Sequence, residues 1–164
     1  MKTLEHRLAW LAGIVDGEGT IYAALNKHRH VRRDGSQGQY LRLTVAVTNT
    51  DILMIEEVQQ IAEAVGVKTR VERIKKRRDL HKEQWDVRVR GGRAVETLLE
   101  AILPYLVTKR SRAEVALAVI RHRRATSYPR NGALRSPVDG DAWLARQLVS
   151  MRDMNRRGAH EVSA

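Results

Sequence analysis

The feature that most constrains the fold is an N-terminal segment that is apolar on nearly every side of a helix. After Thr3, a residue type that caps helices, apolar side chains recur at helical spacing at Leu4, Leu8, Leu11 and Val15. Around the helix axis, Trp10 and Ile14 form a second face, and a third comprises Ala9, Ala12, Gly13 and Asp16. Such a helix has to be covered on all sides, and Gly17 and Gly19 end it.

Gly13 adds a second constraint, because a glycine in mid-helix costs about 1 kcal/mol relative to alanine. Its presence indicates that another backbone comes very close to this face. The natural partner is the same helix of a second copy of the chain, packed across a two-fold axis. A buried core helix in a monomer explains the pattern equally well. The residues expected at a dimer interface are Ala9, Ala12, Gly13 and Asp16.

Strand-like and helical periodicities alternate along the rest of the chain. Alternating apolar residues predict two hairpins, formed by strands over 20–33, 40–49, 67–75 and 84–90. Helical spacing predicts helices over 51–65, 93–103, 111–124 and 141–156, with a loop over 128–137. The order predicts an α+β fold, with an αββαββα core, a four-stranded antiparallel saddle-forming sheet and C-terminal helices. We expect one domain over residues 1–164, with a core over about 4–124 and a helical extension over about 125–164.

Charge and composition narrow the function. The chain holds 30 Lys and Arg against 19 Asp and Glu, a formal net charge of +11, and its basic and acidic stretches alternate. With no cysteine, a disulfide framework and a thiolate metal site are excluded, so a metal would need oxygen or imidazole ligands. The apolar runs are too short for a membrane span and no signal-peptide layout is present. We therefore expect a soluble, intracellular protein with no membrane partner.

The polar faces of the strands are the predicted nucleic-acid surface. If the apolar strand faces pack on the second and third helices, the opposite face is rich in groups that donate to phosphates and base edges. A β surface of this kind can enter the major groove of double-stranded DNA. A solvated basic sheet without a partner is the alternative, and RNA is less favoured because few aromatic residues lie on the strands. The candidate DNA-binding residues are Asn26, His28, His30, Arg32, Tyr40, Arg42, Thr44, Arg70, Gln84, Arg88 and Arg90.

A contiguous motif makes this reading more specific. Residues 11–19 read LAGIVDGEG and lead through Thr20-Ile21-Tyr22 into a strand. This stretch resembles the signature of the LAGLIDADG homing endonucleases, in the subgroup with one motif per chain, and the element order, length and basic sheet also match over about 4–124. The resemblance implies a homodimer whose signature helices meet at the two-fold axis while the two sheets form a saddle over DNA.

The resemblance also implies the catalytic groups. The family's essential carboxylate falls at Glu18, where most members have Asp. Two copies of Glu18, with the Gly17 carbonyl and phosphate oxygens, would hold Mg²⁺, a cation that supplies an activated water and offsets phosphate charge. Ca²⁺ would support binding without cleavage. Asp16 is the second acidic candidate, with an implied role in helix packing and capping.

Two further positions carry over from the family. Asn49 follows the second strand, where the family has a polar residue, often glutamine, that organises active-site water. Lys109 falls where the family often has a lysine near the scissile phosphate, and its ammonium could polarise water or offset developing charge. The alternative for Lys109 is a solvated cation at the start of a helix, within a basic run.

Two other features, a pair of histidines and a basic run, could indicate other functions, but the sequence favours DNA contact for both. His28 and His30 lie two apart on a strand, but with no third ligand nearby a zinc site is not expected, and DNA contact is favoured. The basic run over 75–78 resembles a nuclear localisation signal, yet its position in a hairpin loop favours contact with the phosphate backbone.

The sequence therefore predicts a homodimeric, Mg²⁺-dependent DNA endonuclease of the intron-encoded homing type. It would make double-strand breaks at a long pseudo-palindromic site. The alternative is a non-cleaving nucleic-acid-binding relative, such as an intron maturase or a transcriptional regulator, and the presence of Glu18 and Lys109 argues against it. A basic scaffold that only assembles with nucleoprotein would not need so specific a motif.

Overall fold

A computed structural model describes residues 3–31, 33, 35, 37–74, 82–126, 128–130, 133–135 and 141–156. The elements follow in the order α1 (Leu4–Gly17), β1 (Gly19–Val31), β2 (Gln37–Asn49), α2 (Ile52–Ala64), β3 (Val71–Ile74), β4 (Gln84–Arg90), α3 (Gly92–Ile102), the 3-10 turn η1 (Leu103–Tyr105), α4 (Arg110–Ala125), β5 (Tyr128–Arg130), β6 (Ala133–Arg135) and α5 (Ala142–Met154). The predicted α+β order is confirmed. The predicted loop is wrong where β5 pairs with β6, because strands of three residues are too short to show an alternating pattern.

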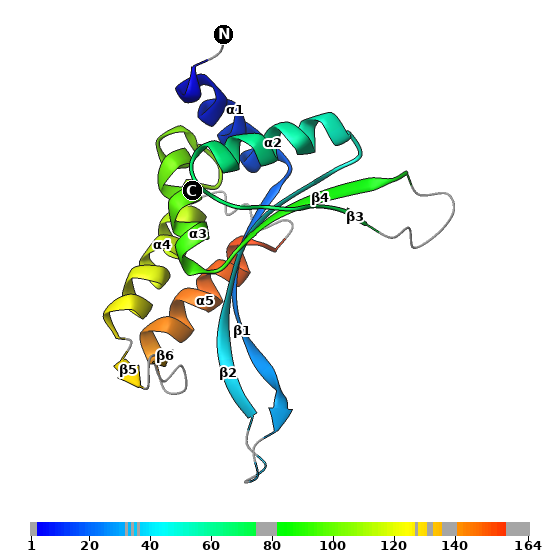
Figure 1. Cartoon of the computed structure of the whole chain (residues 1–164). Helices are drawn as coiled ribbons and strands as arrows, with labels where there is room; N and C mark the ends of the chain where they lie inside the picture. The colour runs from blue at the N-terminus through cyan, green and yellow to red at the C-terminus, as the bar shows by residue number, and fades with distance from the viewer. Residues whose placement is uncertain are drawn as a thin grey trace.

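One four-stranded antiparallel sheet organises the molecule, with strand order β1-β2-β4-β3. The central pair is β2 with β4, where Thr44 lies opposite Arg90 and Asn49 opposite Trp85. The hairpins β1–β2 and β3–β4 diverge from this centre, and the helices gather on one side of them (Figure 1). None of the described helices covers the other side, as the predicted saddle requires.

The third strand is shorter than its sequence pattern predicts. Among the described residues of this segment, Val71–Ile74 pairs with β4, whereas Val67 is buried in the core and precedes the strand. Gly66 adopts a φ of 81° at the end of α2, a conformation that glycine reaches without strain, and this reverses the chain before the strand begins.

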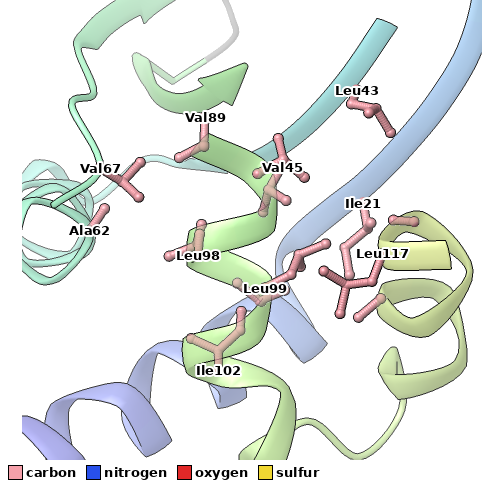
Figure 2. Packing of buried hydrophobic residues seen from close by; sticks show 14 of the residues in the cluster. Ile21, Leu43, Val45, Ala62, Val67, Val89, Leu98, Leu99, Ile102 and Leu117 are labelled. Carbon is pink, nitrogen blue, oxygen red and sulfur yellow. The ribbon is translucent and has the colours of Figure 1, made fainter. Parts of the chain in front are cut away.

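The core lies between the apolar face of the sheet and α2, α3 and α4. Alternate strand residues such as Ile21, Val45 and Val89 are buried, as a half-buried strand requires. In Figure 2, Leu98 of α3 points toward Val67 and Ala62, while Leu99 points toward Ile21 and Leu117. The predicted packing of the sheet on the second and third helices is confirmed.

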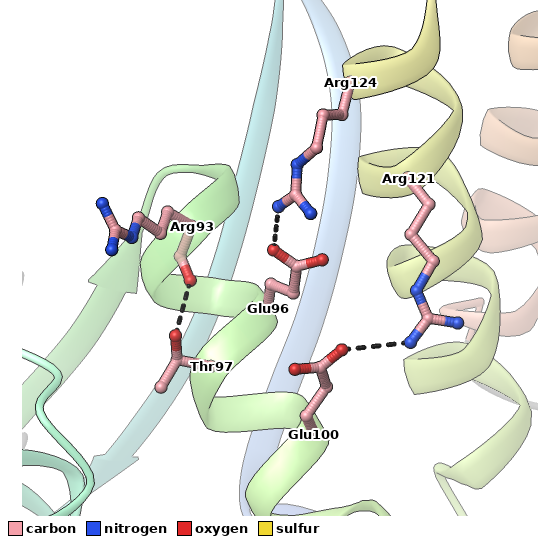
Figure 3. Close-up of polar contacts among 6 residues, drawn as sticks. All are labelled: Arg93, Glu96, Thr97, Glu100, Arg121 and Arg124. Atoms are coloured by element: carbon pink, nitrogen blue, oxygen red, sulfur yellow. Dashed lines mark hydrogen bonds and ion pairs between the residues drawn. The ribbon is translucent and has the colours of Figure 1, made fainter.

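Helices α3 and α4 are also linked by ion pairs that bridge from one helix to the other (Figure 3). The nearly buried carboxylate of Glu96 pairs with Arg124, and Arg121 lies 3.0 Å from Glu100. The exposed second pair contributes at most about 1 kcal/mol, so burial of apolar residues rather than charge holds these helices together.

Helix α5 joins the same core and covers the edge of β1. Leu144 and Met151 are fully buried, and the side chain of Asn155 donates to the Ile21 carbonyl at 3.0 Å. At its other end, Asp141 caps α5 and meets His122 of α4 at 2.7 Å. None of the helices in the described part of the chain is long and apolar enough to cross a membrane.

Candidate active site and nucleic-acid interface

The signature motif forms the last two turns of α1 and the start of β1. Glu18 is the C-cap residue of α1, and its backbone N–H donates to the Ile14 carbonyl at 2.8 Å. Its side chain is exposed and has no hydrogen bond or ion pair among the described residues. The structure therefore presents one free carboxylate at the junction of α1 and β1.

A close approach of two backbones fixes this junction. A Cβ atom on Gly19 would lie 2.7 Å from Cα and 2.8 Å from the carbonyl oxygen of Val15, so only glycine fits there. Glu18 is the residue between this contact and the end of the helix. Its backbone is consequently held by the packing of β1 against α1.

Asp16, the other acid of the motif, is engaged inside the chain. Its carboxylate accepts the backbone N–H groups of Val107 at 2.7 Å and Lys109 at 2.8 Å, and the Thr108 hydroxyl at 3.1 Å. Burial opposes its ionisation, but these hydrogen bonds outweigh burial and lower the pKa of Asp16. The predicted capping role is confirmed, and the helix that Asp16 caps is α4 of its own chain.

Lys109, at the start of α4, makes a second set of contacts with the C-terminal end of α1. Its ammonium donates to the carbonyl oxygens of Val15, at 2.8 Å, and of Asp16, at the C-terminal end of α1. Burial and the neighbouring Arg112 lower the pKa of Lys109, while Asp16 and Glu18 oppose that shift. The side chain is 9% exposed, so the alternative reading of a solvated cation is wrong. Asp16 and Lys109 thus cap each other's helices, consistent with the dipole at each helix end.

Asn49 lies at the same end of the sheet as Glu18, because Gly19 pairs with Val47 two residues before it. Its side-chain oxygen accepts the backbone N–H of Asp51 at 2.9 Å, which forms the turn into α2. No contact among the described residues joins Asn49 to Glu18. Its predicted role in ordering water stays a prediction.

The oxygen donors beside Glu18 are enough for half of the ligand set that a hard cation needs. Among the described residues there is no group of three or more His, Asp or Glu side chains that could hold a metal. One chain offers the Glu18 carboxylate and the Gly17 carbonyl, which is among the last helical carbonyls without an intrahelical partner, while both oxygens of Asp16 are taken. These all-oxygen donors suit Mg²⁺ once a second set is added.

The outer face of α1 carries the predicted dimer contacts. Ala9 and Gly13 are exposed, Trp10 is 36% exposed, and a Cβ atom on Gly13 would meet no atom within 4 Å in its own chain. The prediction for Ala12 is wrong, since its side chain is 0% exposed and packs in the core of the chain. Asp16 points to α4, so its contribution to an interface stays a prediction.

The predicted DNA-binding residues gather on the uncovered face of the sheet. Residues paired across neighbouring antiparallel strands share a face. The register places Asn26 opposite Tyr40, Arg42 beside Tyr22 and Thr44, and Arg88 and Arg90 on the same side of β4 as Gln84. The Arg42 guanidinium lies 6.0 Å from the centre of the Tyr22 ring, and the Asn26 amide donates to the Tyr40 hydroxyl at 3.5 Å.

Some of these predictions need correction or lie beyond the described residues. Thr44 is 5% exposed between its strand neighbours, so the prediction that it contacts DNA is wrong. Arg70 is exposed but precedes β3 rather than lying in it. His28 and His30 lie in β1 between Lys27 and Val31, where the register shifts. Their side chains, like Arg32 and the basic run over 75–78, are outside the described residues.

One residue of this face was not selected from the sequence. Asp86 of β4 is 2% exposed, accepts the Thr48 hydroxyl at 2.9 Å and pairs with Nε of Arg88. The signal that could have found it is an acidic residue at an outward position of a strand whose next two outward residues are Arg88 and Arg90. Together with Lys68, Arg70 and Arg90 it lines a hollow of about 310 Å³.

Comparisons with known proteins show the family and the fold of the chain. The model of the LAGLIDADG-like domain matches residues 5–103. The DNA endonuclease I-CvuI of Chlorella vulgaris is 33% identical over 126 residues, which are 75% of this chain and 69% of that protein. Its crystal structure with its DNA target and Ca has a TM-score of 0.57 at 28% identity, over 72% of this chain and 68% of that one. An archaeal intron-encoded homing endonuclease complexed with DNA shares the fold, with a TM-score of 0.66 over 97% of this chain and 90% of that one at 12% identity.

Proposed function

The chain belongs to the LAGLIDADG homing endonuclease family, and we propose that it is a site-specific DNA endonuclease that makes double-strand breaks by metal-dependent phosphodiester hydrolysis. The observation that carries the proposal is the exposed carboxylate of Glu18, which has no partner among the described residues, at the rigid junction of α1 and β1. This carboxylate lies at the start of the strand whose outward residues belong to the uncovered polar face.

We infer that the working unit is a homodimer joined through the exposed face of α1. Gly13 has open space around its Cβ position and Trp10 is partly exposed, so no contact among the described residues covers this apolar face. A second copy packed across a two-fold axis would cover it and bring two Glu18 side chains together.

In that dimer, Mg²⁺ would be held by the two Glu18 carboxylates and the Gly17 carbonyls, with phosphate oxygens completing the set. The cation would supply an activated water and neutralise charge on the attacked phosphate. Lys109 holds the end of α1 in place and lends positive charge from within the protein, through its bonds to Val15 and Asp16. It acts on the site through the position of Glu18.

The length of the strands sets the length of the proposed target. The first two strands each have 13 residues: β1 is close to its predicted range 20–33, and β2 begins three residues earlier than the predicted range 40–49. At about 3.3 Å per residue each spans about 43 Å, or about 13 base pairs at about 3.4 Å per base pair. Two identical subunits would therefore read a pseudo-palindrome of more than 20 base pairs, about one half-site each.

Selection from a randomised duplex library tests the proposal. Molecules bound in Ca²⁺ and molecules cut in Mg²⁺ should share one long, pseudo-palindromic sequence. Glu18→Gln should still bind that sequence with little loss of affinity but should not cut it, because the change removes a metal ligand and leaves the sheet intact. Glu56→Gln, an equally exposed change on α2, is the matched control and should cut normally.

Two outcomes would contradict the proposal. Nicking by Glu18→Gln at the wild-type rate would remove Glu18 from the active site. Tight binding by the wild type without cleavage in Mg²⁺ or Mn²⁺ would identify a non-cleaving relative, such as a maturase or a regulator.

A further inference from the structure

The uncovered face of the sheet is basic, yet a carboxylate is buried in it. Asp86 is 2% exposed, and both of its oxygens are used: one accepts the Thr48 hydroxyl at 2.9 Å and the other pairs with Nε of Arg88. Thr48 lies directly opposite Asp86 on the neighbouring strand β2. A buried carboxylate is tolerated only when it is paired and hydrogen-bonded, so these three side chains hold one another in a fixed arrangement.

This arrangement decides which donors of Arg88 remain available. A guanidinium has five N–H donors in a planar fork, and Asp86 takes the one on Nε. The terminal nitrogens of Arg88 have no hydrogen bond or ion pair among the described residues, and the side chain is 37% exposed at the hollow it lines. Two parallel donors are therefore presented at a defined angle, with much of their rotational freedom already lost before DNA arrives.

The charge around Arg88 differs from that around its neighbours. Asp86 offsets the charge of Arg88, which weakens its attraction to a phosphate but leaves its directional hydrogen bonds. Arg90 lies on the same face and lines the same hollow, but has no ion pair among the described residues. A full charge of this kind suits phosphate, whereas a neutralised, oriented fork suits the O6 and N7 acceptors of guanine in the major groove.

We propose that Arg88 reads a guanine at one symmetric position of each half-site, and that Asp86 and Thr48 are the positioning residues that make it a base reader. This inference rests on the proposed function, because it assigns a role within the DNA-binding face. It goes beyond the general expectation that the face is basic, since it separates one arginine that specifies sequence from another that contributes affinity.

The experiment measures binding in Ca²⁺ to the selected duplex and to duplexes substituted symmetrically at each position of both half-sites. The wild type should prefer guanine at one position by about 10-fold to 100-fold. Arg88→Ala should abolish that preference, keep the preferences at other positions and change the salt slope little. Arg88→Lys should not restore it, because an ammonium lacks the planar fork. Arg90→Ala, the matched control, should weaken all sequences alike and lower the salt slope by about 1 per subunit.

Asp86→Asn tests the positioning role directly. An asparagine can still accept the Thr48 hydroxyl, but it leaves the charge of Arg88 uncompensated. We expect the guanine preference to fall at least threefold. The salt slope should steepen, because Arg88 would then contact a phosphate instead of the base. If Asp86→Asn does not fold, as judged by circular dichroism, Thr48→Val removes only the hydroxyl donor and should show a smaller loss at the same position.

The possible failures are distinguishable. If the wild type binds no duplex, the proposed function fails. If it binds specifically but Arg88→Ala behaves like Arg90→Ala, Arg88 contacts phosphate and this inference is wrong. If Arg88→Ala loses the preference but neither Asp86→Asn nor Thr48→Val does, the positioning role is wrong.

Discussion

Replacing Asp16 by alanine should destabilise the protein by removing the link between α1 and the start of α4. The change deletes an acceptor of two backbone N–H groups, those of Val107 at 2.7 Å and Lys109 at 2.8 Å, and of the Thr108 hydroxyl at 3.1 Å. These partners lie more than 90 positions away in the sequence, so the lost contacts are tertiary ones.

The magnitude follows from the kind of bond that is lost. A hydrogen bond to a charged group contributes about 1.5 to 3 kcal/mol, and loss of an ordinary helix cap costs about 1 kcal/mol. Asp16 is only partly buried, so water would satisfy some of the stranded donors. We expect a net loss of about 2 to 3 kcal/mol, which in a chain of this size lowers the Tm by about 4 to 12 °C.

The loss should depend on pH with a definite sign. The pKa of Asp16 in the folded state is lowered, since its hydrogen bonds outweigh the opposing effect of burial. The stability it supplies is therefore fully present above the pKa of an unfolded aspartate. It is lost as the pH falls through the lower folded-state pKa. The gap between wild type and Asp16→Ala should accordingly be largest near neutral pH and close in acid.

Urea unfolding followed by circular dichroism, at one protomer concentration and a series of pH values, measures this gap. Asp51→Ala is the matched control, because Asp51 caps α2 through the nearby Leu53 and Met54 N–H groups at 2.9 and 3.4 Å. That local cap should cost about 1 kcal/mol. The reasoning is refuted if Asp16→Ala costs no more than Asp51→Ala, or if its gap to wild type does not narrow in acid.

Two further substitutions test the glycines of the signature helix. Gly13→Leu should convert the dimer to monomer in sedimentation velocity, whereas Ala64→Leu on the exposed end of α2 should not; an unaltered dimer would place the interface elsewhere. Gly19→Ala should lower the free energy of unfolding by about 1 to 3 kcal/mol and impair cleavage, because its Cβ would lie 2.7 Å from the Val15 backbone beside the active-site carboxylate. Wild-type thermal unfolding of that variant would show that the junction can relax.

Most of the fold could be predicted because its strands and helices are half buried. The strand over 84–90 shows one apolar and one polar face, so both of its ends could be predicted from the alternating pattern. The helix predicted over 51–65 differs from α2 by one residue at each end. Short elements could not be found in this way. β5 and β6 have three residues each, and their pairing depends on neighbours rather than on a pattern of their own.

The candidate site was predictable only in part. Glu18 follows from a motif, but the mutual capping of Asp16 and Lys109 joins positions 93 residues apart, and no local pattern reveals it. The projection of α1 grouped Ala12 with Gly13, yet the boundary between the buried and exposed faces falls between them. A helix that is apolar all round does not encode which of its faces meets its own core.

This division of α1 explains why so short a motif can carry several functions. Its inner face is fixed by the core, its C-terminal end is held by Lys109 and by the contact at Gly19, and its outer face is exposed, where we propose that a second copy packs. Glu18 follows directly on this helix, so a shift of α1 at the dimer interface would move the carboxylate as well. A metal site shared by two chains needs each half to be held rigidly before they meet. The contacts inside one chain supply that rigidity, which is why we expect changes at Asp16 or Gly19 to impair cleavage more than DNA binding.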